Sequence, residues 1–144
     1  MTIAFNYKII QRPKPYLSEH VPAIPVTLIG ANTRIDIIGL LDSGADFSAI
    51  PKEIAEVLGL DLSSKPEDIG GIGGDVAAIK TRMQINVNKS KEDYTFQVEV
   101  YAVEKLEEDF PVLIGRQGFF EQFKITFTEA ERKIHLKKYN LRIG

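Results

Sequence analysis

The stretch LLDSGAD, residues 40–46, decides the fold. It ends an apolar run that starts at Ile35, so it brings the carboxylate of Asp42 to the end of a buried strand, where desolvating a charge is costly. Asp and Ser can also bond back to nearby backbone groups, and Gly tolerates a positive φ, so the same letters favour a tight turn. Taken alone, the stretch predicts a strand followed by a turn. Its wider meaning depends on two other segments further along the chain.

The composition is that of an ordinary globular protein. The 144 residues suit one domain with a real core, and 44% of them are hydrophobic and 26% charged. The formal net charge of −2 indicates neither nucleic acid nor a membrane as a partner. The absence of cysteine excludes disulfides, thiol catalysis and cysteine-based metal sites. The chain shows no apolar run long enough to span a bilayer and no signal-peptide pattern, so we expect a cytoplasmic protein.

The expected elements are mostly short strands. Residues 1–25 contain several helix-breaking prolines and are expected to form an N-terminal arm and linker, with the folded domain over residues 26–144. Apolar alternation and turn residues predict strands over residues 26–29, 33–41, 76–87, 94–103, 124–128 and 133–138. One short helix is expected between Pro51 and Gly59, and a second where three phenylalanines recur at helical spacing, at Phe119, Phe120 and Phe123. This pattern predicts a mostly β protein, a small barrel or a sandwich, with one or two short helices.

Two further segments accompany the Asp-Ser-Gly turn. Residues 69–74 read IGGIGG, which is too rich in glycine for a packed strand interior and predicts a mobile hairpin tip. A phosphate-binding loop is the alternative, but Val76 stands where the dinucleotide fingerprint wants Gly or Ala, and a strand rather than a helix follows. Residues 113–116 read LIGR, an apolar run that ends in glycine and arginine.

These three elements, in this order, resemble the retropepsin-like aspartic proteases, the single-lobe relatives of pepsin. The resemblance covers roughly residues 26–123. It implies a small closed β-barrel of the retropepsin type. It also implies an aspartic-type endopeptidase that acts on peptides or proteins and needs no metal or organic cofactor.

The resemblance implies a role for each matching residue. Asp42 matches the catalytic aspartate, and Ser43 and Gly44 match the residues that support the active-site turn. The positions implied to contact substrate are Gly44, Ala45, Asp46 and, in the hairpin called the flap, Gly71, Ile72 and Gly73. Arg116, next to Gly115, matches an arginine that pairs with the acid at Asp46. A structural ion pair and a direct substrate contact are both open for these two charges.

The chemistry of this family requires two neighbouring carboxylates. One activates a water as general base, and the other, protonated, donates to the scissile carbonyl. The chain carries a single Asp-Ser-Gly motif, so an active enzyme requires a two-fold homodimer that places Asp42 beside the partner's copy. The alternative function is a catalytically silent domain of the same fold that binds peptides or only dimerises.

Overall fold

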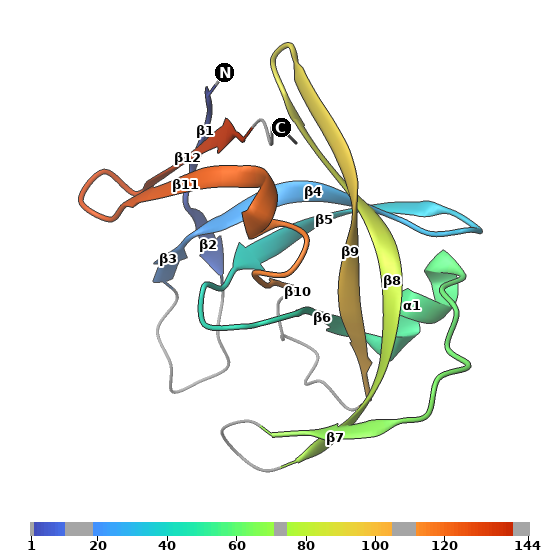
Figure 1. Cartoon of the computed structure of the whole chain (residues 1–144). Coiled ribbons are helices and arrows are strands. Elements are labelled where there is room, and N and C mark those ends of the chain that lie inside the picture. Colours follow the sequence, from blue (N-terminus) through green and yellow to red (C-terminus); the bar gives the residue numbers. More distant parts are fainter. Residues whose placement is uncertain (1, 11–18, 71–74, 105–111, 140–144) are drawn as a thin grey trace, which may run out of the picture.

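Strands make up most of the described chain (Figure 1). A computed structural model describes residues 2–10, 19–70, 75–104 and 112–139. The elements in these residues are, in chain order, β1 (Thr2–Asn6), β2 (Lys8–Ile10), β3 (Glu19–Val21), β4 (Ala23–Ile29), β5 (Arg34–Leu41), β6 (Ser48–Pro51), α1 (Lys52–Leu58), β7 (Glu67–Ile69), β8 (Val76–Lys89), β9 (Glu92–Val103), β10 (Val112–Ile114), the 3₁₀ turn η1 (Phe120–Gln122), β11 (Phe123–Thr128) and β12 (Lys133–Lys138).

The largest sheet closes into a barrel. Its strands follow the order β4-β5-β10-β6-β9-β8-β7, and β4 also pairs with β8. In the described part of the chain, six strands therefore form a closed ring, with β7 attached outside it along β8. The interior is filled by aliphatic side chains that are almost fully buried, among them Ile24, Leu28, Ile50, Ile85, Val98, Val100 and Ile114. The predicted mostly β fold and closed barrel are confirmed.

Strict alternation builds the two longest strands, which cross the molecule as a twisted hairpin (Figure 1). Met83, Ile85 and Val87 of β8 are buried, whereas Arg82 and Gln84, which alternate with them along the strand, are exposed. One face of the ribbon thus enters the core and the other meets solvent, as period-2 patterning requires. Both strands were predicted, and both extend further than expected.

The predicted short helix is confirmed as α1. Gly59 follows it with φ of 77°, a left-handed conformation that glycine adopts without strain, and its N–H closes the last turn. Ala55 and Leu58 bury one side of the helix against the barrel. In the part of the chain that the structure describes, no helix is long and apolar enough to cross a bilayer.

The N-terminal residues belong to a second, three-stranded sheet of order β1-β12-β11, which we call the terminal sheet. β1 pairs along its whole length with β12, from Thr2 opposite Lys137 to Asn6 opposite Lys133. Ile3 and Phe5 are 4% and 5% exposed and join the main core cluster. The first residues are therefore packed, and the expectation of an arm does not describe them. The domain boundary at residue 25 stays a prediction.

The second predicted helix is reduced to a single turn. Of the segment from Phe119 to Phe123, only η1 is helical, and Phe123 already belongs to β11. Phe119 and Phe123 are buried, and the ring of Phe123 lies 5.7 Å from that of Tyr94 and 5.8 Å from that of Phe96. The helical spacing was misleading because Phe123 packs with its ring against β9 from an extended backbone.

Candidate active site

Asp42 is the first residue after β5. Leu41 is buried in the parallel pair of β5 with β10, where it lies opposite Ile114. The Asp42 N–H donates to the Ile114 carbonyl at 2.9 Å, which continues the pairing one step past the strand. The carboxylate is therefore carried by a backbone that the barrel holds in place.

The turn itself orients this carboxylate. The Gly44 N–H donates to Asp42 Oδ1 at 2.9 Å, and the Ala45 N–H donates to the Asp42 carbonyl at 3.2 Å. Asp42 is half-buried, whereas Ser43 and Gly44 are exposed. The Asp-Ser-Gly turn thus presents its acid on an accessible surface of the barrel.

The backbone of residues 115–117 is hydrogen-bonded to the turn, and we call this contact the brace. The Arg116 N–H donates to the Ala45 carbonyl and the Gln117 N–H to the Asp46 carbonyl, each at 2.9 Å. The Arg116 guanidinium also forms an ion pair with Asp46 Oδ1, although the two side chains are 57% and 70% exposed. The structure thus brings together the Asp-Ser-Gly turn and the Gly-Arg segment, the first and third elements of the sequence pattern.

Gly115 fits this brace because it has no side chain. A Cβ atom there would lie 2.4 Å from the backbone carbon and oxygen of Phe47 and 3.0 Å from the Ala45 carbonyl oxygen. Contacts this short are essentially absent from real proteins. The turn and β10 therefore meet backbone to backbone.

Sequence reasoning missed two neighbours of the turn, Ser48 and Phe47. Ser48 is fully buried and its Oγ accepts the Gly115 N–H at 3.1 Å. Phe47 packs edge-on against Tyr101, with ring centroids 5.4 Å apart, and the Lys80 ammonium lies 4.3 Å from its ring centroid. A serine inside the otherwise apolar segment 47–50 was the available signal for Ser48, whereas the Phe47 contacts reach strands far away in sequence.

The flap residues Gly71, Ile72 and Gly73 lie outside the described residues. The strands that lead to them are described. β7 pairs with β8 as an antiparallel hairpin, with Ile69 opposite Val76. This pairing agrees with a hairpin whose connection includes the glycine-rich segment.

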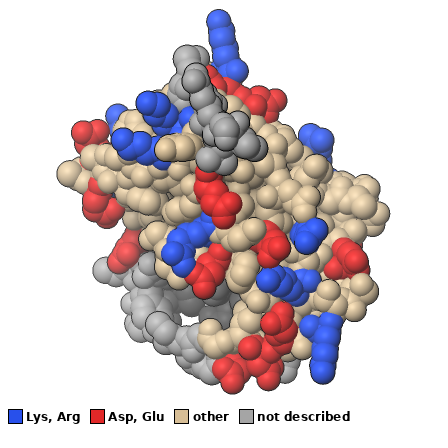
Figure 2. Space-filling view, in the orientation of Figure 1, with Lys and Arg blue, Asp and Glu red and all other residues tan. Residues whose placement is uncertain are grey.

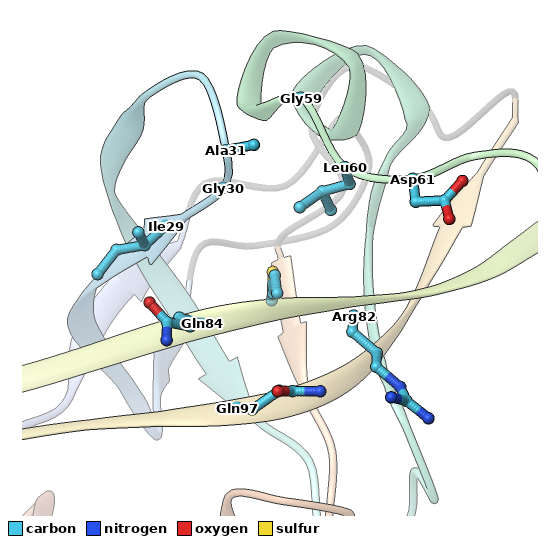
Figure 3. A pocket seen from close by; sticks show the side chains of 10 residues that line it. Ile29, Gly30, Ala31, Gly59, Leu60, Asp61, Arg82, Gln84 and Gln97 are labelled. Carbon is cyan, nitrogen blue, oxygen red and sulfur yellow. The ribbon is translucent and has the colours of Figure 1, made fainter.

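A cavity of about 460 Å³ lies on another part of the barrel, beside the end of α1 (Figure 3). Its lining residues are Ile29, Gly30, Ala31, Gly59, Leu60, Asp61, Arg82, Met83, Gln84 and Gln97. None of them is a predicted site residue. Hydrogen bonds from the Ser63 side chain and backbone hold the pKa of Asp61 below its usual value.

Three solved structures are similar to this chain. The protease of EIAV, complexed with an inhibitor, is 26% identical over 68% of this chain and 84% of that chain, with a TM-score of 0.46. A retropepsin-like aspartic protease from Rickettsia conorii is 20% identical over 94% and 93%, with a TM-score of 0.47. The retroviral protease-like domain of Ddi1 from Leishmania major is 17% identical over 83% and 94%, with a TM-score of 0.50, and supports the fold alone.

The sequence comparison decides the family. The family model described as aspartyl protease matches residues 24–117, which is more than half of the chain. A search of curated proteins finds no match. The matched region contains most of the barrel, the Asp-Ser-Gly turn and the Arg116 segment that braces it. On this match the chain belongs to the aspartyl protease family, with a closed barrel of the retropepsin type.

Proposed function

We propose that the protein is an aspartic endopeptidase that works as a homodimer, with a water held between the Asp42 carboxylates of the two protomers. The observation that carries the proposal is the placement of Asp42. It stands on an accessible turn that Gly44, β10 and Arg116 hold through backbone hydrogen bonds. A catalytic carboxylate needs this combination of access and fixed orientation.

The proposed chemistry divides two roles between two like groups. One Asp42 carboxylate accepts a proton from the water as it attacks the peptide carbonyl. The other, protonated, donates to the carbonyl oxygen and regains that proton as the tetrahedral intermediate collapses, while the first carboxyl group passes the proton it took from the water to the departing amine nitrogen. Two carboxylates at hydrogen-bond range share one proton because both cannot be charged cheaply; the aspartic proteases are the standard example of this effect. A two-fold axis through the site supplies the second carboxylate from an identical turn.

The neighbours of Asp42 have proposed roles in holding substrate. Gly44 is exposed and carries no side chain, so an extended peptide can approach the backbone of the turn closely. Asp46, which forms an ion pair with Arg116, would accept hydrogen bonds from the peptide backbone. Ser43 and Ala45 complete the turn, and the flap residues Gly71, Ile72 and Gly73 would close over the peptide and exclude water.

The test compares cleavage of a peptide library by the wild type, Asp42→Asn and the control Asp36→Asn, from acid to neutral pH. Asp36 is an exposed aspartate on β5, the strand that leads to Asp42, and among the described residues its side chain is hydrogen-bonded only to Thr27. We expect the wild type and the control to cleave alike, and Asp42→Asn to lose activity by about 10³-fold or more with its circular dichroism unchanged.

Cleavage by folded Asp42→Asn at the wild-type rate would contradict the proposal. Peptide binding without cleavage by any of the three proteins, at concentrations where sedimentation shows a dimer, would contradict it too. That second result would identify the silent binding domain instead.

A further inference from the structure

The terminal sheet has one buried face and one face open to solvent. Strand pairing places Lys124 opposite Lys137 and Lys133 opposite Thr128. Because side chains alternate, these positions share the face opposite to Ile134 and Leu136, which are fully buried. The residues of this outer face, which we call the lysine face, are Thr2, Ala4, Asn6, Lys124, Thr126, Thr128, Lys133, His135 and Lys137.

The lysine face carries cations and no described acid. In the described part of the chain, Lys124, Lys133 and Lys137 take part in no ion pair and no side-chain hydrogen bond. Lysine and arginine side chains gather in Figure 2 in the region where Figure 1 draws β11 and β12. A hollow of about 320 Å³ lies between Lys124 and the end of β12, lined also by Lys137, Lys138 and Tyr139.

This arrangement is unfavourable in the free protein. Like charges directly opposite in an antiparallel pair destabilise a sheet, and Lys124 and Lys137 stand in that relation. The cluster also stands out because the whole chain has a net charge of −2. A bound anion would relieve the repulsion.

We propose that the lysine face is a docking surface for an acidic, extended segment of another polypeptide. Lys133 and Lys137 lie on one strand, four residues and about 13 Å apart, with Lys124 beside Lys137. An extended peptide has the same repeat, so acids at positions i and i+4 would meet Lys133 and the Lys124–Lys137 pair together. The threonines and Asn6 between the lysines offer hydrogen bonds to such a peptide.

A second copy of the chain, a membrane or a nucleic acid would fit the lysine face less well than an acidic peptide. Two lysine faces would repel each other, which disfavours a second copy of the chain. A membrane-binding surface needs apolar side chains to insert or a larger basic cluster, and this face offers neither. Nucleic acid needs a longer basic track than three lysines, and Glu129 and Glu131 lie in the turn at one end of this one.

The test measures binding of two labelled nine-residue peptides to the full chain, one with glutamate at alternate positions and one with glutamine there. The chain carries Asp42→Asn so that peptide is not cut, which makes the result independent of the proposed protease activity. The variant is Lys124→Gln with Lys137→Gln. The control is Lys8→Gln with Lys65→Gln, which removes the same charge from two exposed lysines elsewhere.

We expect the glutamate peptide to bind at least about fivefold more tightly than the glutamine peptide at low salt, and less so at high salt. The Lys124/Lys137 variant should lose about fivefold to tenfold in affinity, and the control less than about twofold. Equal binding of the two peptides, or an equal loss in the control, would overturn the proposal. So would tighter binding of a DNA duplex or of phosphatidylserine vesicles through the same lysines, or loss of a dimer in the variant.

A second readout needs no ligand. Lys124→Gln removes one of the two facing charges, so the free protein should gain about 1 to 2 °C in Tm at low salt, while Lys8→Gln should not. A fall in Tm, or the same gain in the control, would contradict the claim that the unoccupied lysine face is under repulsion.

Discussion

The turn at residues 42–46 and the terminal sheet each bring together segments that lie far apart in the sequence, but they do so through different contacts. The turn meets residues 115–117 backbone to backbone, through carbonyls of Ala45 and Asp46 and a glycine with no room for a side chain. The terminal sheet joins the two ends of the described chain through the pairing of β1 with β12 and through buried apolar side chains, among them Ile3 and Phe5. The first region should therefore tolerate almost no change in shape, whereas the second should respond in proportion to the apolar surface removed.

The largest effect is expected from Gly115→Ala. Its Cβ would stand 2.4 Å from backbone atoms of Phe47, so the brace must open to accept it. We expect a loss of about 4 kcal/mol or more in the free energy of unfolding, or failure to fold, measured by urea denaturation. Gly44→Ala is the matched control, because its Cβ would come no closer than 3.3 Å to Asp42 Oδ1, and it should cost less than about 1 kcal/mol. Equal stability of the two variants would show that the brace is not a tight backbone contact.

Phe5→Ala tests the packing of the terminal sheet. Phe5 is 5% exposed, and its ring also carries the Lys89 ammonium 4.9 Å from its centroid. Truncation should cost about 3 to 4 kcal/mol, whereas Phe127→Ala, at a ring that is 39% exposed, should cost less than half as much. A cost below about 1 kcal/mol for Phe5→Ala, by thermal or urea unfolding, would mean that the N-terminal residues form a detachable arm after all.

Ser48→Ala removes a single hydrogen bond from the brace. Ser48 is fully buried and accepts the Gly115 N–H, so the variant leaves a buried donor without its partner. We expect a loss of about 1 to 2 kcal/mol, against no measurable loss for the exposed Ser43→Ala. An equal loss in the free energy of unfolding for the two serine variants, measured by chemical denaturation, would contradict this role of Ser48.

Arg116→Ala should affect stability least. Its ion pair with Asp46 is more than half exposed on both sides, so the free energy of unfolding should change by less than about 1 kcal/mol. If Asp46 holds the substrate backbone, kcat/KM should nevertheless fall at least about tenfold, since the acid loses the partner that orients it. Unchanged kcat/KM would assign the pair a purely structural role.

The contrast between the turn and the terminal sheet also explains which features could be predicted from the sequence. The Asp-Ser-Gly turn, the Gly-Arg segment and α1 are local patterns, and each was found where its letters indicated. β8 was predictable because Met83, Ile85 and Val87 alternate with polar residues, and β9 because Phe96, Val98 and Val100 alternate in the same way. The partner of β1 and the strand position of Phe123 were not visible, because both depend on contacts with distant strands, β12 and β9. The roles of Ser48 and Gln117 depend likewise on segments that only the fold brings together.

The most direct test of the central claim is a mixing experiment that asks whether one site uses two copies of Asp42. Wild type and Asp42→Asn are unfolded together, refolded at constant total concentration, and assayed on a peptide that the wild type cleaves. If each site needs both carboxylates, an equal mixture should retain about one quarter of the wild-type activity, because random pairing leaves about that share of dimers intact. The same mixture with Asp36→Asn should keep full activity. Retention of half the activity in the Asp42→Asn mixture would contradict the account, since each protomer would then act alone.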